Sequence, residues 1–270
     1  MAGGSKYNRR WMLSGFSSHW HYLWLVTASL IAGVMNALAG GGSFLSFPAM
    51  LSMGVLPIQA NATNTVALWP GQLTSLATLK ADVRKDLVPV VATTSILGGL
   101  SGAIVLLRTG QVQFMHMIPW LLLMGAVIFG ISGPVSKWLR RRSAEPHSQR
   151  TPRILPLFCA LFPICFYIGY FGAGGGFLVM TVLALFGVEE MHALNAMKIV
   201  AATLSNMVAI ITFIVTGAVL WHYCIISMVF AATGGHIGAR YARRMNPDVL
   251  RIIVVATGCA ISAYFFWRQS

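Results

Sequence analysis

Long apolar stretches alternate with short polar connections along the chain, and this pattern predicts membrane-spanning helices. No Asp, Glu, Lys or Arg occurs in 22–79, 87–107, 109–136, 154–188, 199–239 or 252–267. A helix of about 20 apolar residues crosses the hydrocarbon core of a bilayer. A spanning sheet would instead need a closed barrel with alternating polarity, which these stretches lack. The sequence therefore predicts an all-α, polytopic membrane protein.

Ten helical segments follow from these stretches. They are 22–40, 44–56, 60–79, 87–107, 115–138, 154–172, 176–187, 192–217, 222–243 and 248–267. Segments 44–56 and 176–187 are too short to cross a bilayer comfortably, and each follows a glycine triplet. We expect these two to be short broken or re-entrant helices, and the sequence leaves open whether they fully span.

The chain is duplicated with an offset of about 134 residues. Its aligned pieces are 40–42 with 174–176, 61–67 with 195–201, Gln72 with Asn206, and 98–103 with 234–239. Each copy holds five predicted segments, and an odd number inserts the two copies with opposite orientation. Inverted repeats with broken helices are typical of secondary transporters, which bind substrate where the repeats meet. The last aligned pieces contain small residues four apart, which favour close helix packing.

The repeats define the expected organisation of the chain. We predict an N-terminal tail at 1–21, a first transmembrane repeat at 22–139, a polar linker at 140–153 and a second repeat at 154–268.

Composition excludes an ordinary soluble domain, because 57% of the 270 residues are hydrophobic and only 9% are charged. The net charge of +13 does not indicate a nucleic-acid partner, since the basic residues cluster between apolar stretches. Thirteen Lys and Arg lie in 80–86, 137–153 and 240–251, and five lie in the connections and ends assigned to the other side. The positive-inside rule then places the basic connections in the cytoplasm and both termini outside.

The duplicated motifs resemble those of the TauE/SafE family, also called the 4-toluene sulfonate uptake permeases, over about 24–268. They read AGVMNALAGGGSFLSFPAML with ANATN in the first copy, and GAGGGFLVM with ALNAMKIVAATLSN in the second. The resemblance implies a multi-pass transporter of the bacterial cytoplasmic (inner) membrane for small sulfur-containing anions such as sulfite, sulfoacetate or other sulfonates. One departure is Thr65, where relatives often carry Lys, so only the second copy keeps a Lys.

Lys198 is the sharpest candidate for an anion-binding residue. It lies within or near an apolar stretch, and no Asp or Glu lies inside any long apolar stretch to pair with it. A membrane-embedded Lys is costly unless it is paired or faces a wet cavity. An unpaired cation suits an anion, and the alternative is that Lys198 reaches the membrane surface along its flexible stem.

The remaining candidates are backbone amides and neutral polar side chains. Glycine triplets let a ligand approach the backbone, and the first N–H groups of a helix favour anions. Amides and hydroxyls suit the oxygens of sulfite or a sulfonate. The candidates are Gly40, Gly41, Gly42, Gly174, Gly175 and Gly176, with Asn61, Thr63, Asn64, Thr65, Gln72, Asn195, Ser205 and Asn206. The alternatives are tight helix packing for the glycines and interhelical hydrogen bonds for the side chains.

Several residue patterns are absent, and their absence narrows the function. The sequence has no HExxH motif and no Walker A motif, and its four cysteines form no CxxC pair. We therefore expect no metal, no cofactor and no enzyme activity, and a lipid bilayer, a small anion and a homodimer as partners. The alternatives left open are a transporter of other carboxylate or inorganic anions, an anion channel, and a membrane-embedded enzyme or assembly partner.

Overall fold

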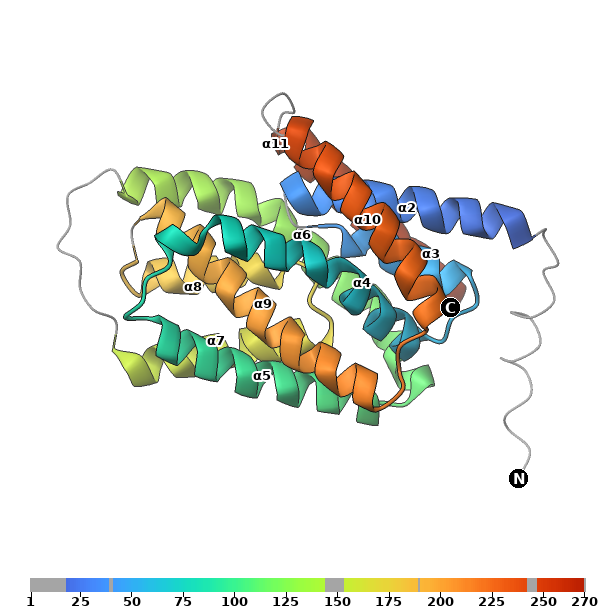
Figure 1. The fold of residues 1–270 in the computed structure, drawn as a ribbon, viewed down its shortest axis with the longest axis horizontal. Helices are drawn as coiled ribbons and strands as arrows, with labels where there is room; N and C mark the ends of the chain where they lie inside the picture. The colour runs from blue at the N-terminus through green and yellow to red at the C-terminus, as the bar shows by residue number, and fades with distance from the viewer. Residues whose placement is uncertain (1–17, 39–40, 144–152, 189, 242–246, 270) are drawn as a thin grey trace.

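The computed structural model describes residues 18–38, 41–143, 153–188, 190–241 and 247–269, and no strand occurs among them. Ten α-helices follow one another in these residues (Figure 1). They are α2 (Ser18–Leu38), α3 (Ser43–Ser52), α4 (Pro57–Thr78), α5 (Val88–Arg108), α6 (Gln111–Ser143), α7 (Ile154–Tyr170), α8 (Gly175–Leu185), α9 (Met191–Val215), α10 (Trp221–Tyr241) and α11 (Pro247–Gln269), with a 3-10 turn η1 (Lys80–Asp82) after α4. The predicted all-α fold is confirmed.

The helix bounds differ from the expected ones at polar flanks. Helix α2 begins at Ser18, inside the predicted tail, and α6 continues to Ser143, inside the predicted linker. Polar residues such as Ser and Arg continue a helix beyond the apolar stretch, because they lack the backbone constraint of Gly or Pro. The rest of the tail (1–17) and of the linker (144–152) lies outside the described residues.

Helix length separates the membrane-spanning elements from the short ones. Helices α5, α9 and the 111–135 part of α6 are long and apolar enough to cross a membrane. Helices α3 and α8 have 10 and 11 residues, or about 15–17 Å at 1.5 Å per residue. Each therefore reaches only about half of a hydrocarbon core roughly 30 Å thick.

Helices α8 and α9 each end at a glycine with positive φ. Gly187 follows α8 with φ +94°, and Gly217 follows α9 with φ +69°. After each glycine, the next amide donates to a carbonyl five residues earlier: Val188 to Leu183, and Ala218 to Phe213. This is the Schellman arrangement, which needs a left-handed residue and so favours glycine.

The two halves of the chain pack on each other in a reciprocal pattern. Helix α5 packs most extensively on α7, and α2 packs to a similar extent on α10. In the duplicated sequence, α5 is equivalent to α10 and α7 is equivalent to α2. The α5–α7 pair is therefore equivalent to the α10–α2 pair. Each pair joins one helix from each half of the chain.

Glycines form the closest point of both pairs. A Cβ on Gly169 of α7 would overlap the carbonyl of Gly99 in α5, and one on Gly33 of α2 would lie 2.8 Å from the amide nitrogen of Gly235 in α10. Gly33 and Gly169 are 136 residues apart, as are Gly99 and Gly235. The close packing predicted for the small residues at 98–103 and 234–239 is therefore present, and it is reciprocal.

Helices α4 and α9 run antiparallel through the centre of the bundle (Figure 1). The amide of Leu220, after α9, donates to the Thr63 hydroxyl near the start of α4 at 3.0 Å. At the other end, η1 packs on α9.

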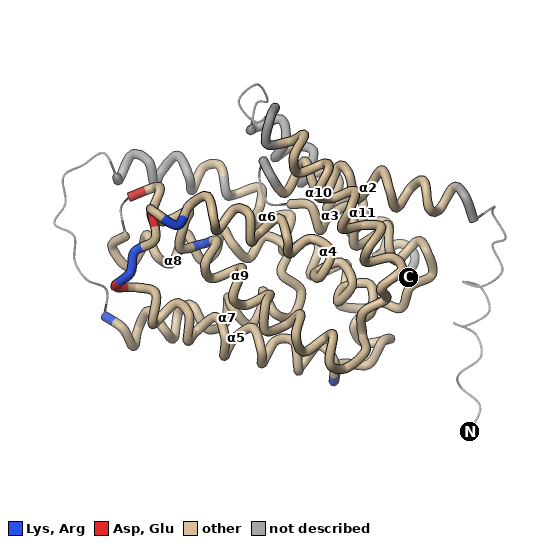
Figure 2. Tube along the Cα trace, in the orientation of Figure 1, with Lys and Arg blue, Asp and Glu red and all other residues tan. Residues whose placement is uncertain are grey.

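Charge is concentrated at one end of the bundle. Lys and Arg gather where the α4–α5 connection meets the starts of α7 and α9 (Figure 2), whereas Arg108 ends α5 at the opposite end. This end carries connections that the positive-inside rule assigns to the cytoplasm.

Candidate functional site

The halves of the chain meet through pairs of equivalent residues on α4 and α9. The indole Nε1 of Trp69 donates to the carbonyl of Thr203 at 3.2 Å, and the Asn206 amide Nδ2 donates to Gln72 Oε1 at 3.0 Å. Both pairs are 134 residues apart, the offset of the duplication. Each hydrogen bond joins a residue to its own counterpart in the alignment, and we call these two contacts axial, since a pseudo-two-fold axis between the halves would pass beside them.

Lys198 lies on α9 toward the Lys- and Arg-rich end of the bundle. Its Nζ is 5.3 Å from the centre of the Phe177 ring in α8, which is a cation–π contact. The side chain is partly buried, and no ion pair or hydrogen bond to it occurs among the described residues. The cation is therefore held by an aromatic ring and is free to take an anionic partner.

The start of α8 lies directly against the Lys198 stem. Gly174 precedes the helix with φ +78°, a conformation that favours glycine. A Cβ on Gly176 would lie 3.2 Å from Lys198 Cγ, and one on Gly175 would lie 2.5 Å from Ile168 Cγ1. The triplet thus lets α8 approach both α7 and α9, and Gly176 lies against the Lys198 stem.

In the first half, the residue equivalent to Lys198 is uncharged and makes a hydrogen bond to another uncharged side chain. Asn64 is the counterpart of Lys198, and its Oδ1 accepts from the Ser46 hydroxyl of α3 at 2.5 Å. Both side chains are buried. A Cβ on Gly42, at the start of α3, would overlap the Ala32 carbonyl of α2, so this glycine serves close packing. Gly41 is buried beside it, and Gly40 lies outside the described residues.

Three further polar residues of α4 have partners within the protein. The Asn61 amide donates to the Tyr170 carbonyl at 3.1 Å, which ties α4 to the end of α7. Thr63 accepts from the amide of Leu220, and the Thr65 hydroxyl donates to the Asn61 carbonyl of its own helix at 2.8 Å. Their hydrogen bonds match the structural alternative raised by the sequence.

Asn195 and Ser205 lie on α9 on either side of Lys198 along the chain. Asn195 is partly buried, and the described residues provide it with no hydrogen bond. Ser205 is buried where α9 meets α5, with its Cα 2.7 Å from the position of a Cβ on Gly99. Asn195 therefore joins Lys198 as a side chain with free hydrogen-bonding capacity. The Ser205 hydroxyl also lacks a partner among the described residues, but it is enclosed at a helix contact.

Both short helices meet on α6 through aromatic side chains. The ring of Phe129 is 5.3 Å from that of Phe177 in α8 and 6.4 Å from that of Phe44 in α3. A Cβ on Gly125, one turn earlier in α6, would lie 2.9 Å from Phe44 and 3.1 Å from the Ala173 carbonyl. The starts of the two short helices are thus linked through α6.

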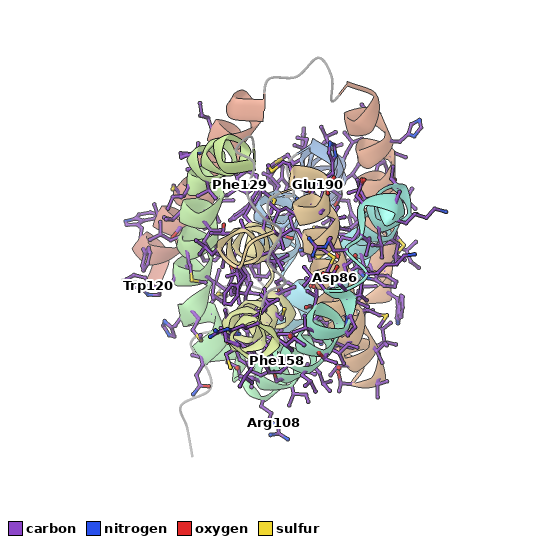
Figure 3. The ribbon with its side chains drawn as sticks, turned by 90° about the vertical axis from the view of Figure 1, so that its left-hand side faces the viewer. Asp86, Arg108, Trp120, Phe129, Phe158 and Glu190 are labelled. Atoms are coloured by element: carbon purple, nitrogen blue, oxygen red, sulfur yellow. The ribbon has the colours of Figure 1, made fainter. Side chains whose placement is uncertain are left out.

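A charged cluster lies at the end of the bundle beyond Lys198. Arg84 donates through Nε and Nη2 to both carboxylate oxygens of Asp86, at 2.8 and 2.6 Å. The hydrogen bond with Arg84 lowers the pKa of Asp86, and the same contact raises the pKa of Arg84. Glu190, which precedes α9, lies near enough to favour the charged form of Arg84. Figure 3 looks onto this end of the bundle, with Asp86 and Glu190 labelled.

Sequence reasoning missed four residues that shape this region. Phe177 and Ser46 are the partners of Lys198 and Asn64, Trp69 lies at the axis, and Tyr170 supplies a carbonyl. One signal in the sequence could have indicated an axial contact. It is that Trp69 and Thr203 align at the same offset as Gln72 and Asn206.

Comparison with known proteins agrees with this architecture. The family profile described as "Sulfite exporter TauE/SafE" matches residues 25–265. The chain belongs to the TauE/SafE family. No solved structure matches the chain.

Curated members of the TauE/SafE family match over nearly the whole chain. The "Probable membrane transporter protein ORF9" of a Sinorhizobium species is 28% identical, with 88% of this chain and 89% of the relative covered. "Probable membrane transporter protein YfcA" of Escherichia coli K12 is 26% identical, with 88% and 87% covered. A "Probable membrane transporter protein" of Haemophilus influenzae is 26% identical, with 91% and 94% covered. Family and relatives support a multi-pass membrane transporter rather than an enzyme.

Proposed function

We propose that the chain is a secondary transporter of small sulfur-containing anions, such as sulfite, sulfoacetate or another sulfonate, in the cytoplasmic membrane of a bacterium. The observation that carries the proposal is Lys198, a cation in a membrane-spanning helix that has no acidic partner among the described residues. An anion that leaves water needs a compensating charge and hydrogen bonds. Lys198 supplies the charge, and Asn195 and the start of α8 supply N–H donors.

The reciprocal packing of the halves supports a proposal for the transport cycle. We propose that they are inverted repeats and that they rock about the α4–α9 contact, giving alternating access. Antiparallel α4 and α9, with Gln72 bound to Asn206, support this view. The family description names sulfite, and for this chain sulfite is the first anion to test.

Counterflow in proteoliposomes tests the proposal. Purified protein is reconstituted with one unlabelled anion inside, and uptake of the labelled anion is followed for sulfite, sulfoacetate, taurine, toluenesulfonate and lactate. We expect saturable exchange of a sulfur oxyanion that is lost in Lys198→Ala and is retained in Lys85→Ala, which removes an exposed Lys from the α4–α5 connection.

The other outcomes decide between the remaining functions. Exchange of lactate without exchange of sulfur oxyanions would show that the substrates are carboxylates and not sulfur-containing anions. Flux far above carrier rates, with single-channel currents, would indicate a channel. Folded, inserted protein that exchanges none of these anions would contradict transport of small anions.

A further inference from the structure

Asn64 and Lys198 occupy equivalent places in the two halves, but their surroundings differ. Each lies on a central helix and reaches toward the start of a short helix, α3 for Asn64 and α8 for Lys198. Both are five residues before an axial residue, Trp69 or Thr203. Five residues span about 7–8 Å of helix. Because α4 and α9 are antiparallel, the two side chains lie on opposite sides of the pseudo-two-fold axis.

The neighbours of the two side chains are not equivalent. Ser46, which binds Asn64, corresponds to buried Met180 in the second half. Phe177, which lies under the Lys198 ammonium, corresponds to Ser43 in the first half. The first half therefore has a closed pair of neutral groups, and the second half has an open cation on an aromatic ring.

Charge also separates the two places. Helix α4 contains no Lys, Arg or His, so an anion beside Asn64 would find no cation on that helix. Transfer of an anion from water into a low-dielectric site is unfavourable without such a charge. Ser46 already uses the Asn64 carbonyl oxygen, and both side chains are buried.

We propose that each chain holds a single anion, off the pseudo-two-fold axis, beside Lys198, Asn195 and Gly176, and that the equivalent Asn64–Ser46 pair is a positioning contact that fixes α3. This proposal rests on the proposed function, because it specifies where the transported anion binds. The site lies on the side of the axis that faces the Lys- and Arg-rich end. The two repeats therefore have different roles, although their helices pack reciprocally.

Equilibrium binding to the full chain in detergent tests the proposal, with sulfite and sulfoacetate as probes. We expect one anion per chain, and binding weakened about 30-fold or more in Lys198→Ala, as for loss of one member of a charge pair. Lys198→Arg keeps the charge and should retain measurable binding. Asn64→Ala and Ser46→Ala each remove the same hydrogen bond, one by deleting its acceptor and the other by deleting its donor. We expect each to lower the melting temperature while changing the Kd less than about threefold.

Two results would overturn the single off-axis site. They are two anions per chain, or a loss of binding in Ser46→Ala as large as in Lys198→Ala while Ser46→Ala remains folded. Exchange and binding that survive Lys198→Ala would also remove the site, but they would leave the proposed transport function standing. A wild-type chain that neither binds nor exchanges any probe would overturn both proposals.

Discussion

The side-chain amide of Asn206 donates to Gln72, its counterpart in the other half of the chain, at 3.0 Å. Gln72 and Asn206 each lie three residues after a member of the other axial pair, Trp69 and Thr203. Two contacts between equivalent residues thus join α4 and α9. In the proposed transport cycle, this is the region where the relative movement of the halves would be smallest.

Loss of either side of the axial pair should destabilise the protein, and loss of both should cost less than the sum. Hydrogen bonds between membrane helices contribute about 0.6 kcal/mol on average and up to roughly 1.7 kcal/mol. Gln72→Ala or Asn206→Ala leaves the other amide without its partner, whereas the double variant removes both groups. Unfolding in mixed micelles measures the three free energies, and strict additivity would contradict the coupling.

The ring of Phe177 should raise the affinity for the transported anion by holding the Lys198 ammonium in place. Cation–π contacts contribute about 0.5–2 kcal/mol. Phe177→Leu should therefore raise the half-saturation concentration in counterflow by roughly 2- to 30-fold. Phe186→Leu, at the other end of the same short helix, is the matched control and should leave it unchanged. An equal effect of both substitutions would point to general damage of α8.

A methyl group at the α5–α7 contact should be far more damaging than one on an open helix face. Gly169→Ala overlaps the Gly99 carbonyl, whereas Gly71→Ala meets nothing within 4 Å. Overpacking costs about 1–3 kcal/mol. We expect a clearly lower melting temperature for Gly169→Ala and an unchanged or slightly higher one for Gly71→Ala. Equal melting temperatures for both variants would contradict the tight packing.

The stabilisation by the Arg84–Asp86 pair should be constant near neutral pH and should be lost only in acid. Because the folded-state pKa of Asp86 is lowered by Arg84, its contribution is complete above the unfolded value near 3.9 and disappears as the pH falls through the folded value. Exposed pairs contribute about 0–1 kcal/mol. Asp86→Asn should lower the melting temperature slightly and equally at pH 5 and pH 8. A difference that grew between these pH values would contradict this assignment.

The fold could be predicted from the sequence because the length and apolarity of each stretch determine a membrane helix. All ten helices lie where the stretches predict them. The ends of α2 and α6 could not be placed, since polar residues beyond the apolar stretch also continue a helix. Helix partners were also beyond reach, because an apolar face does not specify which other helix covers it.

The candidate site shows the same division between local and tertiary information. The duplication predicts that Asn64 and Lys198 are equivalent, and the axial contacts of Gln72 and Trp69 agree with that alignment. Alignment does not reveal that Ser46 binds one of them and Phe177 lies under the other. These contacts depend on how α3 and α8 approach the central helices, and the glycines that permit the approach are visible only as a motif.

The cross-half pairing of helices has a consequence for synthesis. Helix α2 leaves the ribosome with its main partner, α10, still more than 180 residues away. At about 5–20 residues per second, the surface of α2 around Gly33 has no partner for roughly 10–40 seconds, until α10 is made. During this interval lipid, or the insertion machinery, must cover the backbone of α2 that Gly33 leaves without a side chain. Neither half can complete its packing alone: the α5–α7 pair can form once α7 is inserted, whereas the α2–α10 pair must wait for α10.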